Sequence, residues 1–346
     1  MRAAQFLAWG PVFFQAARVL RDRGILKVLI GNAASGLGVD EIAERTRTSP
    51  YGVTVLLEAG LSAGLVTREL VDGQAVFRPT QVAYLVHRDP MTRANMNFVH
   101  DVCYRAMGHL DEAIADGAPS GLVELGKWPT IYEGLAHLGE PARSSWLEFD
   151  HFYSDDSFPL VMEHVFQSAP KRVLDVGCNT GKFTLTLLRH DAGVQVTGAD
   201  LPGQIASCKK NVAEAGFSPR VSYHPVDLLK ADASLPSGHD VIWMSQFLCC
   251  FSEPEIVHVL TAARRAMGPR TRLLIMDTFW DQQPTEAGQV VLHATSLYFT
   301  CLANGNSRMY DGVTFKRCIQ QAGLRLESEK NAIGWGHTLL ECKLEL

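Results

Sequence analysis

A glycine-rich segment, VLDVGCNTGKF at residues 173–183, carries the residue types best suited to hold a small ligand. Its apolar first half predicts a buried strand that ends before Gly177, and Gly181 marks the start of a helix. Glycine accepts a positive φ and lets a ligand approach the backbone closely. Asp175, near the end of the strand, suits a cationic or amino-bearing ligand, whereas a dinucleotide-binding turn would have glycine in place of Asn179. The segment therefore disfavours a pyrophosphate ligand.

Acidic residues also follow the next two predicted strands. Asp200 ends the strand QVTGAD, where a carboxylate can accept hydrogen bonds from both hydroxyls of a ribose. Asp227 and its neighbour Leu228 follow the strand VSYHPV, where a carboxylate can accept a hydrogen bond from the exocyclic amine of adenine. These positions share the carboxyl edge of the sheet, where open α/β sheets bind ligands. Together they predict a nucleoside site, and the alternative is that Asp200 and Asp227 only cap the helices that follow.

From Lys171 onward, strand-like and helical segments alternate along the chain. Near-continuous apolar strands separated by helices predict a doubly wound, mostly parallel, Rossmann-like α/β sheet. The last two strand-like segments, LRLESEKN and HTLLECKL, leave no room for a helix between them. They predict an antiparallel hairpin at the sheet edge.

The N-terminal part of the chain follows a different pattern. Helical periodicity predicts three helices, at residues 12–30, 39–46 and 50–61. Residues 65–80 predict two strands around a turn at Asp72 and Gly73. Three helices followed by a hairpin is the order of a winged helix.

The composition is that of a globular protein with no general attraction to polyanions. Apolar residues make up 47% of the 346 residues and the formal net charge is −5, so neither nucleic acid nor a membrane is expected as a partner. The sequence has no uninterrupted apolar run of about 18 residues, so no membrane span is expected. Gly10 and Pro11 interrupt the apolar N-terminal stretch, which favours an amphipathic helix over a signal peptide. The eight cysteines form no CxxC pair, and we expect free thiols in the reducing cytoplasm.

Three motifs, VLDVGCNTG, the acid-Leu-Pro of ADLPGQ, and Asp227-Leu228, resemble those of a known family. The family is that of class I S-adenosylmethionine-dependent methyltransferases, in particular the small-molecule O-methyltransferases with an N-terminal winged-helix-like dimerisation domain. The resemblance covers essentially the whole chain. It implies S-adenosylmethionine as cofactor, a small aromatic acceptor and a homodimer. It further implies a dimerisation domain over residues 1–110, a helical linker and lid over residues 111–165, and a cofactor-binding methyltransferase domain over residues 166–346.

The resemblance also assigns individual residues to the site. The cofactor-binding residues that it implies are Tyr153, Ser154, Asp175, Gly177, Asn179, Gly181, Asp200, Leu201, Asp227, Leu228, Ser245 and Gln246. The acceptor-pocket residues that it implies are Phe158, Met162, Tyr298 and Phe299. A stripe of aromatic residues and methionine is also typical of a packed core, and that alternative stays open. The residues that resemble the dimer arm of the family are Phe6, Leu7, Trp9, Val12 and Phe13.

The catalytic position departs from the family pattern. The family has a segment resembling LHDWPDEE, whose His deprotonates the acceptor, but residues 245–255 read SQFLCCFSEPE, with Cys249 where His is expected. A neutral thiol is a poorer general base than imidazole. Besides Cys249 itself, three alternatives stay open: rate supplied mainly by positioning, a base at His293 or Asp277, or attack by a ring carbon ortho to a phenolate. Both O-methylation and ring C-methylation are therefore possible outcomes, and no metal site is implied, because Cys249-Cys250 lacks ligand spacing and partners.

Three other protein classes fit parts of the sequence. A winged helix commonly binds DNA, but residues 49–66 contain no Lys or Arg and offer a poor surface for phosphate contacts. A methyltransferase-like protein that has lost catalysis is compatible with Cys249. An NAD-dependent dehydrogenase is disfavoured by Asn179 in the turn. A methyltransferase is therefore favoured, with a catalytically altered regulatory or DNA-binding protein as the alternative.

Overall fold

The computed structural model describes residues 1–345, which form two compact units, one comprising Met1–Val99 and one that begins at His100. Each unit packs around its own hydrophobic core. The boundaries expected near residues 110 and 165 stay predictions. None of the helices within the described residues is long and apolar enough to cross a lipid bilayer. All eight cysteines are free thiols, as expected.

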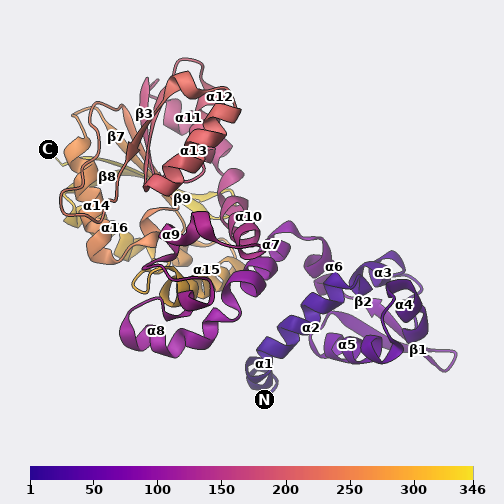
Figure 1. Ribbon diagram of the computed structural model, residues 1–346. Helices are drawn as coiled ribbons and strands as arrows, with labels where there is room; N and C mark the ends of the chain where they lie inside the picture. Colours follow the sequence, from indigo (N-terminus) through magenta and orange to yellow (C-terminus); the bar gives the residue numbers. More distant parts are fainter. Residues whose placement is uncertain (346) are drawn as a thin grey trace. The chain divides into compact units, whose positions relative to one another are not determined.

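The N-terminal unit is a group of helices with one small hairpin (Figure 1). Its elements are α1 (Arg2–Ala8), α2 (Gly10–Asp22), α3 (Ile25–Gly31), α4 (Val39–Thr46), α5 (Pro50–Ser62), β1 (Val66–Val71), β2 (Gln74–Pro79), α6 (Gln81–Arg88) and α7 (Pro90–Phe98). The prediction of one helix over residues 12–30 is wrong, because Gly24 takes a left-handed conformation with a φ of 76° and separates α2 from α3. The buried side chains of Leu20, Leu29 and Leu57 join the helices in one core.

The hairpin forms where the sequence predicts it. Asp72 and Gly73 have φ values of 50° and 79°, and a type I′ turn needs a positive φ at both central positions. Val71 and Gln74 pair directly across the turn. The order of helices followed by a hairpin is therefore confirmed.

The second unit is built on a seven-stranded sheet with the order β5-β4-β3-β6-β7-β9-β8. Its strands are β3 (Arg172–Val176), β4 (Gln195–Asp200), β5 (Val221–Pro225), β6 (Val241–Ser245), β7 (Arg272–Asp277), β8 (Leu324–Ile333) and β9 (His337–Leu344). The strands β3 to β7 are parallel, whereas β9 is antiparallel to both β7 and β8. The predicted doubly wound α/β fold and its C-terminal hairpin are confirmed. The strand order reverses between β3 and β6, and ligands bind at such switch points.

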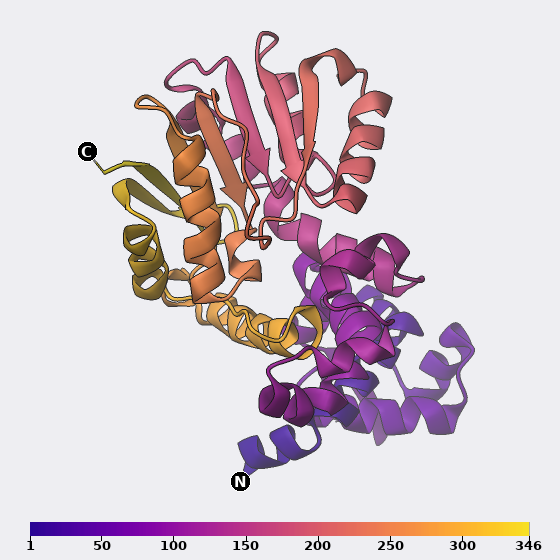
Figure 2. The same ribbon diagram turned by 60° about the vertical axis from the view of Figure 1, so that its left-hand side comes forward.

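Helices cover both faces of this sheet (Figure 1). They are α11 (Phe158–Phe166), α12 (Lys182–His190), α13 (Pro202–Glu214), α14 (Glu253–Ala266) and α16 (Gly312–Gln321). Successive residues of a strand point to opposite faces, so Val173 packs with α11 and α12 whereas Leu174 packs with α14 and α16. Figure 2 shows α14, in orange, lying along the strands. All residues of β7 are buried, as expected of a central parallel strand.

A helical cover lies over the carboxyl edge of the sheet. It consists of α8 (Leu110–Asp116), α9 (Ile131–Gly134), α10 (Ala142–Asp155) and α15 (Glu286–Tyr298), which continues into a π-helical turn at Phe299–Ala303. Asn304 Nδ2 donates to the backbone oxygen of Cys250, in the turn after β6, at 2.7 Å. Gln204 Nε2, at the start of α13, donates to the backbone oxygen of Tyr132, in α9, at 2.9 Å. Two distant chain segments are thus fastened above the strand ends.

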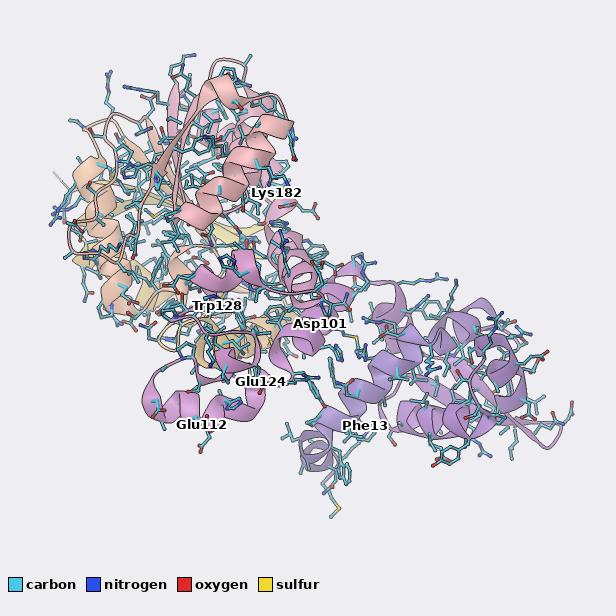
Figure 3. The ribbon with its side chains drawn as sticks, viewed as in Figure 1. Phe13, Asp101, Glu112, Glu124, Trp128 and Lys182 are labelled. Atoms are coloured by element: carbon cyan, nitrogen blue, oxygen red, sulfur yellow. The ribbon has the colours of Figure 1, made fainter. Side chains whose placement is uncertain are left out.

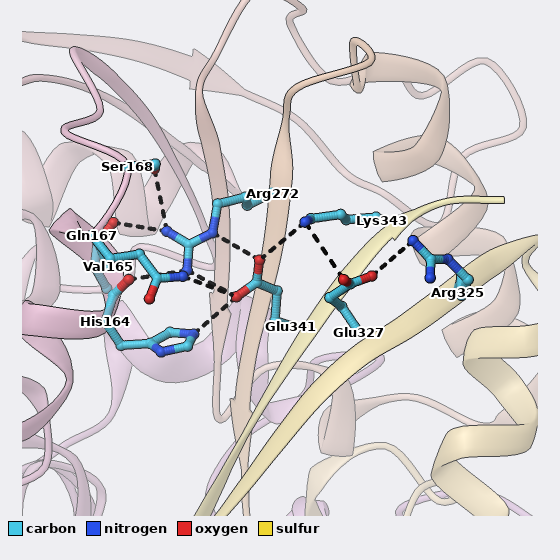
Figure 4. Close-up of polar contacts among 9 residues, drawn as sticks. All are labelled: His164, Val165, Gln167, Ser168, Arg272, Arg325, Glu327, Glu341 and Lys343. Carbon is cyan, nitrogen blue, oxygen red and sulfur yellow. Dashed lines mark hydrogen bonds and ion pairs between the residues drawn. The ribbon is translucent and has the colours of Figure 1, made fainter. Parts of the chain in front are cut away.

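A buried ion pair joins β7 and β9 at the end of the sheet that lies opposite the carboxyl ends of the parallel strands (Figure 4). Arg272, the first residue of β7, donates to both carboxylate oxygens of Glu341 in β9 at 2.9 Å. The same guanidinium donates to the backbone oxygens of His164 and Val165 in α11. Both charged side chains are about 5% exposed, and their hydrogen bonds compensate for the lost solvation. The pair therefore ties α11 to the sheet.

Candidate active site

The turn after β3 needs glycine at two positions. Gly177 and Gly181 have φ values of 75° and 83°, which residues with a Cβ rarely adopt. A Cβ at Gly177 would overlap the ring of Phe247, and one at Gly181 would lie 2.8 Å from the sulfur of Cys208. Gly177 N also donates to the backbone oxygen of Ala199 at 2.8 Å. The turn is therefore both tightly packed and fastened to the end of β4.

Asp200 holds this turn from the neighbouring strand. Its Oδ2 accepts a hydrogen bond from Asn179 N at 2.8 Å, and its Oδ1 accepts one from Leu201 N at 2.7 Å. Each oxygen keeps a further acceptor position, so the carboxylate can still receive two hydroxyl groups of a ligand. Burial raises the pKa of Asp200 to about 6. The structure thus brings these three predicted residues together.

Asp175 lies beneath the turn. Its side chain is buried, and Oδ2 accepts a hydrogen bond from Oγ1 of Thr184 in α12 at 2.6 Å. Burial raises the pKa of Asp175 to about 7. The carboxyl group anchors α12 to β3, and its contact with the methionine end of a cofactor stays a prediction.

The ends of β5 and β6 carry the remaining predicted strand-end residues. Asp227 is half-buried and accepts a backbone hydrogen bond at 3.1 Å, while Leu228 packs into the core. Gln246 has a positive φ of 45° and turns the chain at the end of β6. The hydroxyl of Ser245 is buried and has no hydrogen-bond partner within residues 1–345. Since buried polar groups are nearly always hydrogen-bonded, a polar ligand atom suits this position at the switch point.

Helix α10 contacts the turn through side chains that the sequence prediction missed. Asp150 Oδ2 accepts a hydrogen bond from Asn179 Nδ2 at 3.1 Å. Asp155 pairs with Lys182, at the start of α12, at 2.8 Å (Figure 3). Burial and the charge of Asp155 raise the pKa of Asp150 to about 7. An acid on a polar helix is usually solvated, so the sequence carries no signal for this contact.

The predicted lid residues lie on the same helix. The ring of Tyr153 meets those of Phe149 and Phe152 edge-on, with centroid distances of 5.4 and 5.3 Å. Ser154 is buried, and its Oγ lies 3.3 Å from the backbone oxygen of Asp150. Their contact with the cofactor stays a prediction.

The turn after β6 places Cys249 beside Asp277. Cys249 N donates to Asp277 Oδ2 at 3.3 Å, and Thr278 N donates to Oδ1 at 2.9 Å. The neighbouring thiol of Cys250, burial and Asp277 raise the pKa of Cys249 well above its ordinary value. Burial raises the pKa of Asp277 to about 6. Cys249 is therefore a neutral thiol, and Asp277 orients the turn through both of its oxygens.

His293, the third predicted catalytic residue, lies on the exposed face of α15. Its ring centroid is 5.2 Å from that of Trp280. Val290 and Leu297, three residues before and four after it, are exposed on the same face, whereas Tyr298 is buried. This position contrasts with the burial of Cys249 and Asp277, and a role for His293 as base stays a prediction.

The four predicted pocket residues fall into two groups. Phe158 and Met162 pack in the core between α11, α12 and the sheet. The hydroxyl of Tyr298 accepts a hydrogen bond from Nε1 of Trp146, in α10, at 2.8 Å. The ring of Phe299 lies 5.5 Å from that of Tyr298. Tyr298 and Phe299 thus belong to the helical cover, and Phe158 and Met162 do not.

Known protein families match both parts of this chain. A model of the Dimerisation2-like domain matches residues 1–72, and a model of the methyltransferase domain matches residues 149–329, more than half of the sequence. The chain belongs to the methyltransferase family. This methyltransferase depends on S-adenosylmethionine and carries an N-terminal dimerisation domain, as the resemblance implied.

Two relatives that align with most of this methyltransferase differ from it at most positions. L-tyrosine C(3)-methyltransferase of Streptomyces lavendulae is 21% identical over 95% of this chain and 88% of that enzyme. The 3-hydroxy-5-methyl-1-naphthoate 3-O-methyltransferase of Streptomyces sahachiroi is 27% identical over 92% of this chain and 87% of that enzyme. The apo crystal structure of the S-adenosylmethionine-dependent methyltransferase SibL has a TM-score of 0.74 at 23% identity and covers 99% of both chains. The methyltransferase therefore shares its fold with SibL.

The residues at the carboxyl edge of the sheet fit S-adenosylmethionine. Asp200 keeps an acceptor position on each oxygen for the two ribose hydroxyls. Ser245 offers a buried hydroxyl that has no hydrogen-bond partner in the described part of the chain. Burial raises the pKa of both Asp150 and Asp175 to about 7, and a cationic ligand beside these carboxyl groups would favour their ionised forms. When bound, S-adenosylmethionine supplies a methyl group that its sulfonium charge has already activated.

Proposed function

We propose that this methyltransferase transfers the methyl group of S-adenosylmethionine to a small phenolic acceptor. The observation that carries the proposal is the neutral thiol of Cys249, at the position where the family has its His base. Because this thiol is a poor base, the acceptor needs a hydroxyl group that ionises readily. Phenols meet this need, since a phenolic hydroxyl has a pKa of about 10.

Aromatic side chains around the turn after β6 support a planar acceptor. Tyr132 in α9 and Tyr298 in α15 both interact electrostatically with Cys250. Trp146 is hydrogen-bonded to Tyr298. Aromatic walls with a few polar groups are typical of sites for small planar ligands. The two curated relatives act, by their names, on tyrosine and on a hydroxynaphthoate, which are both hydroxylated aromatic compounds.

Ring C-methylation is the second candidate reaction. An ionised phenol carries negative charge on its oxygen and on its ortho carbons, so either atom can attack the methyl group. Two observations favour attack by the ring carbon. Cys249 stands at the position where the family has its His base, and the chain is similar to an L-tyrosine C(3)-methyltransferase. O-methylation remains the reaction of the naphthoate relative.

A homodimer formed through the N-terminal unit completes the proposal. Leu7 in α1, Trp9 between the two helices and Val12 in α2 are 84%, 57% and 56% exposed. The rings of Phe6 and Phe13 stack at 5.0 Å and hold the two helices together. So much exposed apolar surface favours a second copy of the chain as its partner.

The test is mass spectrometry with methyl-labelled S-adenosylmethionine and a panel of phenols and hydroxybenzoyl compounds. We expect label on at least one phenol, and fragmentation of the product assigns it to oxygen or carbon. Gly177→Val, which fills the turn, is the control and should transfer no label. Transfer to aliphatic alcohols or amines but to no phenol would contradict the proposal.

A further inference from the structure

The backbone of Tyr132 is held firmly in the helical cover. Helix α9 begins with a capping box in which the Glu133 carboxylate accepts two hydrogen bonds from the N-cap residue, at 2.9 and 2.8 Å. Gln204 Nε2, from α13, donates to the backbone oxygen of Tyr132 at 2.9 Å. The ring of Trp128 (Figure 3) fills the space that a Cβ at Gly134 would need. Tyr132 therefore has a defined position rather than that of a surface loop.

The hydroxyl group of Tyr132 lacks comparable anchors. Its oxygen is buried and has no partner within hydrogen-bonding geometry among residues 1–345, although buried polar groups are nearly always hydrogen-bonded. The thiol of Cys250 is the side chain near enough to interact with the hydroxyl as a hydrogen-bonding group, and that interaction helps to raise the pKa of Tyr132. The titratable groups that face it are Cys249 and Cys250, in the turn after β6, and Tyr298, in α15. Burial raises the pKa of Tyr132 well above its ordinary value, so its hydroxyl keeps the proton and can act as a donor.

The neighbouring polar groups are engaged elsewhere. The thiol of Cys250 is directed at the backbone oxygen of Gln246, at 3.9 Å. The hydroxyl of Tyr298 accepts a hydrogen bond from Trp146 at 2.8 Å. A thiol sulfur is in any case a weak acceptor. The Cys250 sulfur is therefore only a weak acceptor for the proton of Tyr132, which stays available to a stronger acceptor atom of a ligand.

We infer that Tyr132 is a catalytic residue that donates a hydrogen bond to the ionised oxygen of the phenolic acceptor, an inference that rests on the function proposed above. The turn that Tyr132 faces is the one that carries Cys249 and is oriented by Asp277. A neutral donor directed at a phenolate oxygen stabilises the ionised form and lowers the pKa of the bound phenol. Tyr132 thereby does part of the work that the family assigns to a His base.

The reaction then balances without a protein base. The phenol loses its hydroxyl proton to solvent before transfer, and an electron pair of the phenolate forms the new bond to the methyl carbon. The bond from that carbon to sulfur breaks, and its electrons return to sulfur, which leaves neutral S-adenosylhomocysteine. If an ortho carbon attacks, the ring afterwards loses its proton at that carbon to solvent. Because the hydrogen bond from Tyr132 occupies the phenolate oxygen, it also favours attack by the carbon.

The test replaces Tyr132 by phenylalanine, which keeps the ring and removes only the hydroxyl. The probe is 4-nitrophenol, whose ionised form absorbs visible light, titrated with pH in the presence of full-length protein and S-adenosylhomocysteine. We expect Y132F to raise the pKa of the bound probe by about one to two pH units relative to wild type, the size expected for a lost hydrogen bond to a charged group. With the phenol that accepts label, the rate near neutral pH should fall about ten- to hundredfold and recover at high pH, where the phenol ionises unaided.

Tyr223→Phe is the matched control. Tyr223 lies in β5 and also has a buried hydroxyl with no hydrogen-bond partner in the described chain, so Y223F should leave the pKa of the bound probe unchanged. If Y132F binds the probe with the pKa of wild type, or if both variants shift it equally, the inference is overturned while the phenolic function stands. If wild type binds neither 4-nitrophenol nor any phenol of the panel, the proposed function fails and the inference fails with it.

Discussion

Replacing Cys249 by serine removes the thiol from the turn after β6 and keeps a side chain of nearly the same size. The backbone N–H of Cys249 donates to Asp277, and the substitution leaves this hydrogen bond in place. The thiol also interacts with the Asp277 carboxyl group, and a serine hydroxyl can form the same hydrogen bond. The variant therefore tests the chemistry of the thiol and preserves the shape of the turn.

The structure predicts a small effect on the rate. A thiol with an ordinary pKa of about 8.5 would be about 3% ionised at pH 7. In this turn the Cys250 thiol, burial and Asp277 raise the pKa of Cys249 well above that value, so even less thiolate is present. Loss of a working general base costs about 10²- to 10⁴-fold, and we expect Cys249→Ser to lose less than about tenfold. Asp277→Asn should do more damage, because an amide cannot accept hydrogen bonds from both Cys249 N and Thr278 N.

The assay follows formation of S-adenosylhomocysteine with a phenol that accepts label, between pH 6 and pH 9. Cys342→Ser, which alters another buried thiol in β9, controls for the general effect of such a change. Activity that rises with the titration of the phenol in wild type and in Cys249→Ser alike would support a self-ionising acceptor. A loss of about 10²-fold or more, with S-adenosylmethionine affinity intact, would refute the reasoning and restore Cys249 as the base.

Three further predictions concern the cofactor, the fold and the assembly. Asp200→Asn should weaken S-adenosylmethionine binding by about 1.5–3 kcal/mol, because charge-assisted hydrogen bonds are lost, and unchanged affinity in isothermal titration calorimetry would remove Asp200 from the site. Glu341→Gln should lower the free energy of unfolding at pH 7 by about 3–5 kcal/mol, since Arg272 keeps its buried charge. The hydrogen bond from Arg272 lowers the pKa of Glu341 below its ordinary 4.5, so the stabilisation is present above that pH and is lost as the pH falls through the lower folded-state value; denaturation curves that differ equally at pH 7 and pH 3 would argue against the ion pair. Deletion of residues 1–14 should convert a homodimer into monomer or aggregate in light scattering, and a full-length chain that is already monomeric at micromolar concentration would disprove the dimer.

Local physical chemistry explains why much of the fold could be read from the sequence. The strands of the sheet are short apolar runs between turns. Such runs are typical of strands in a parallel sheet whose two faces are both covered by helices. Asp72 and Gly73 determine their hairpin by their tolerance of a positive φ. Gly177 and Gly181 predict the turn after β3 for the same reason, since both adopt a positive φ. Gly24 shows the limit, since helical periodicity on both sides of it hid a left-handed residue that ends one helix and starts another.

Tertiary structure alone decided which buried or polar residues meet. Hydrophobic periodicity shows that a residue is buried and leaves its partners undefined, so Phe158 and Tyr298 were predicted alike although one packs against the sheet and the other lies in the helical cover. Asp150 reaches Asn179 only because α10 lies against the turn after β3. Tyr132 reached the turn after β6 in the same way, from a segment far away in the sequence. Such contacts depend on long-range packing, which determines the shape and charge of the site and which no local pattern of residues records.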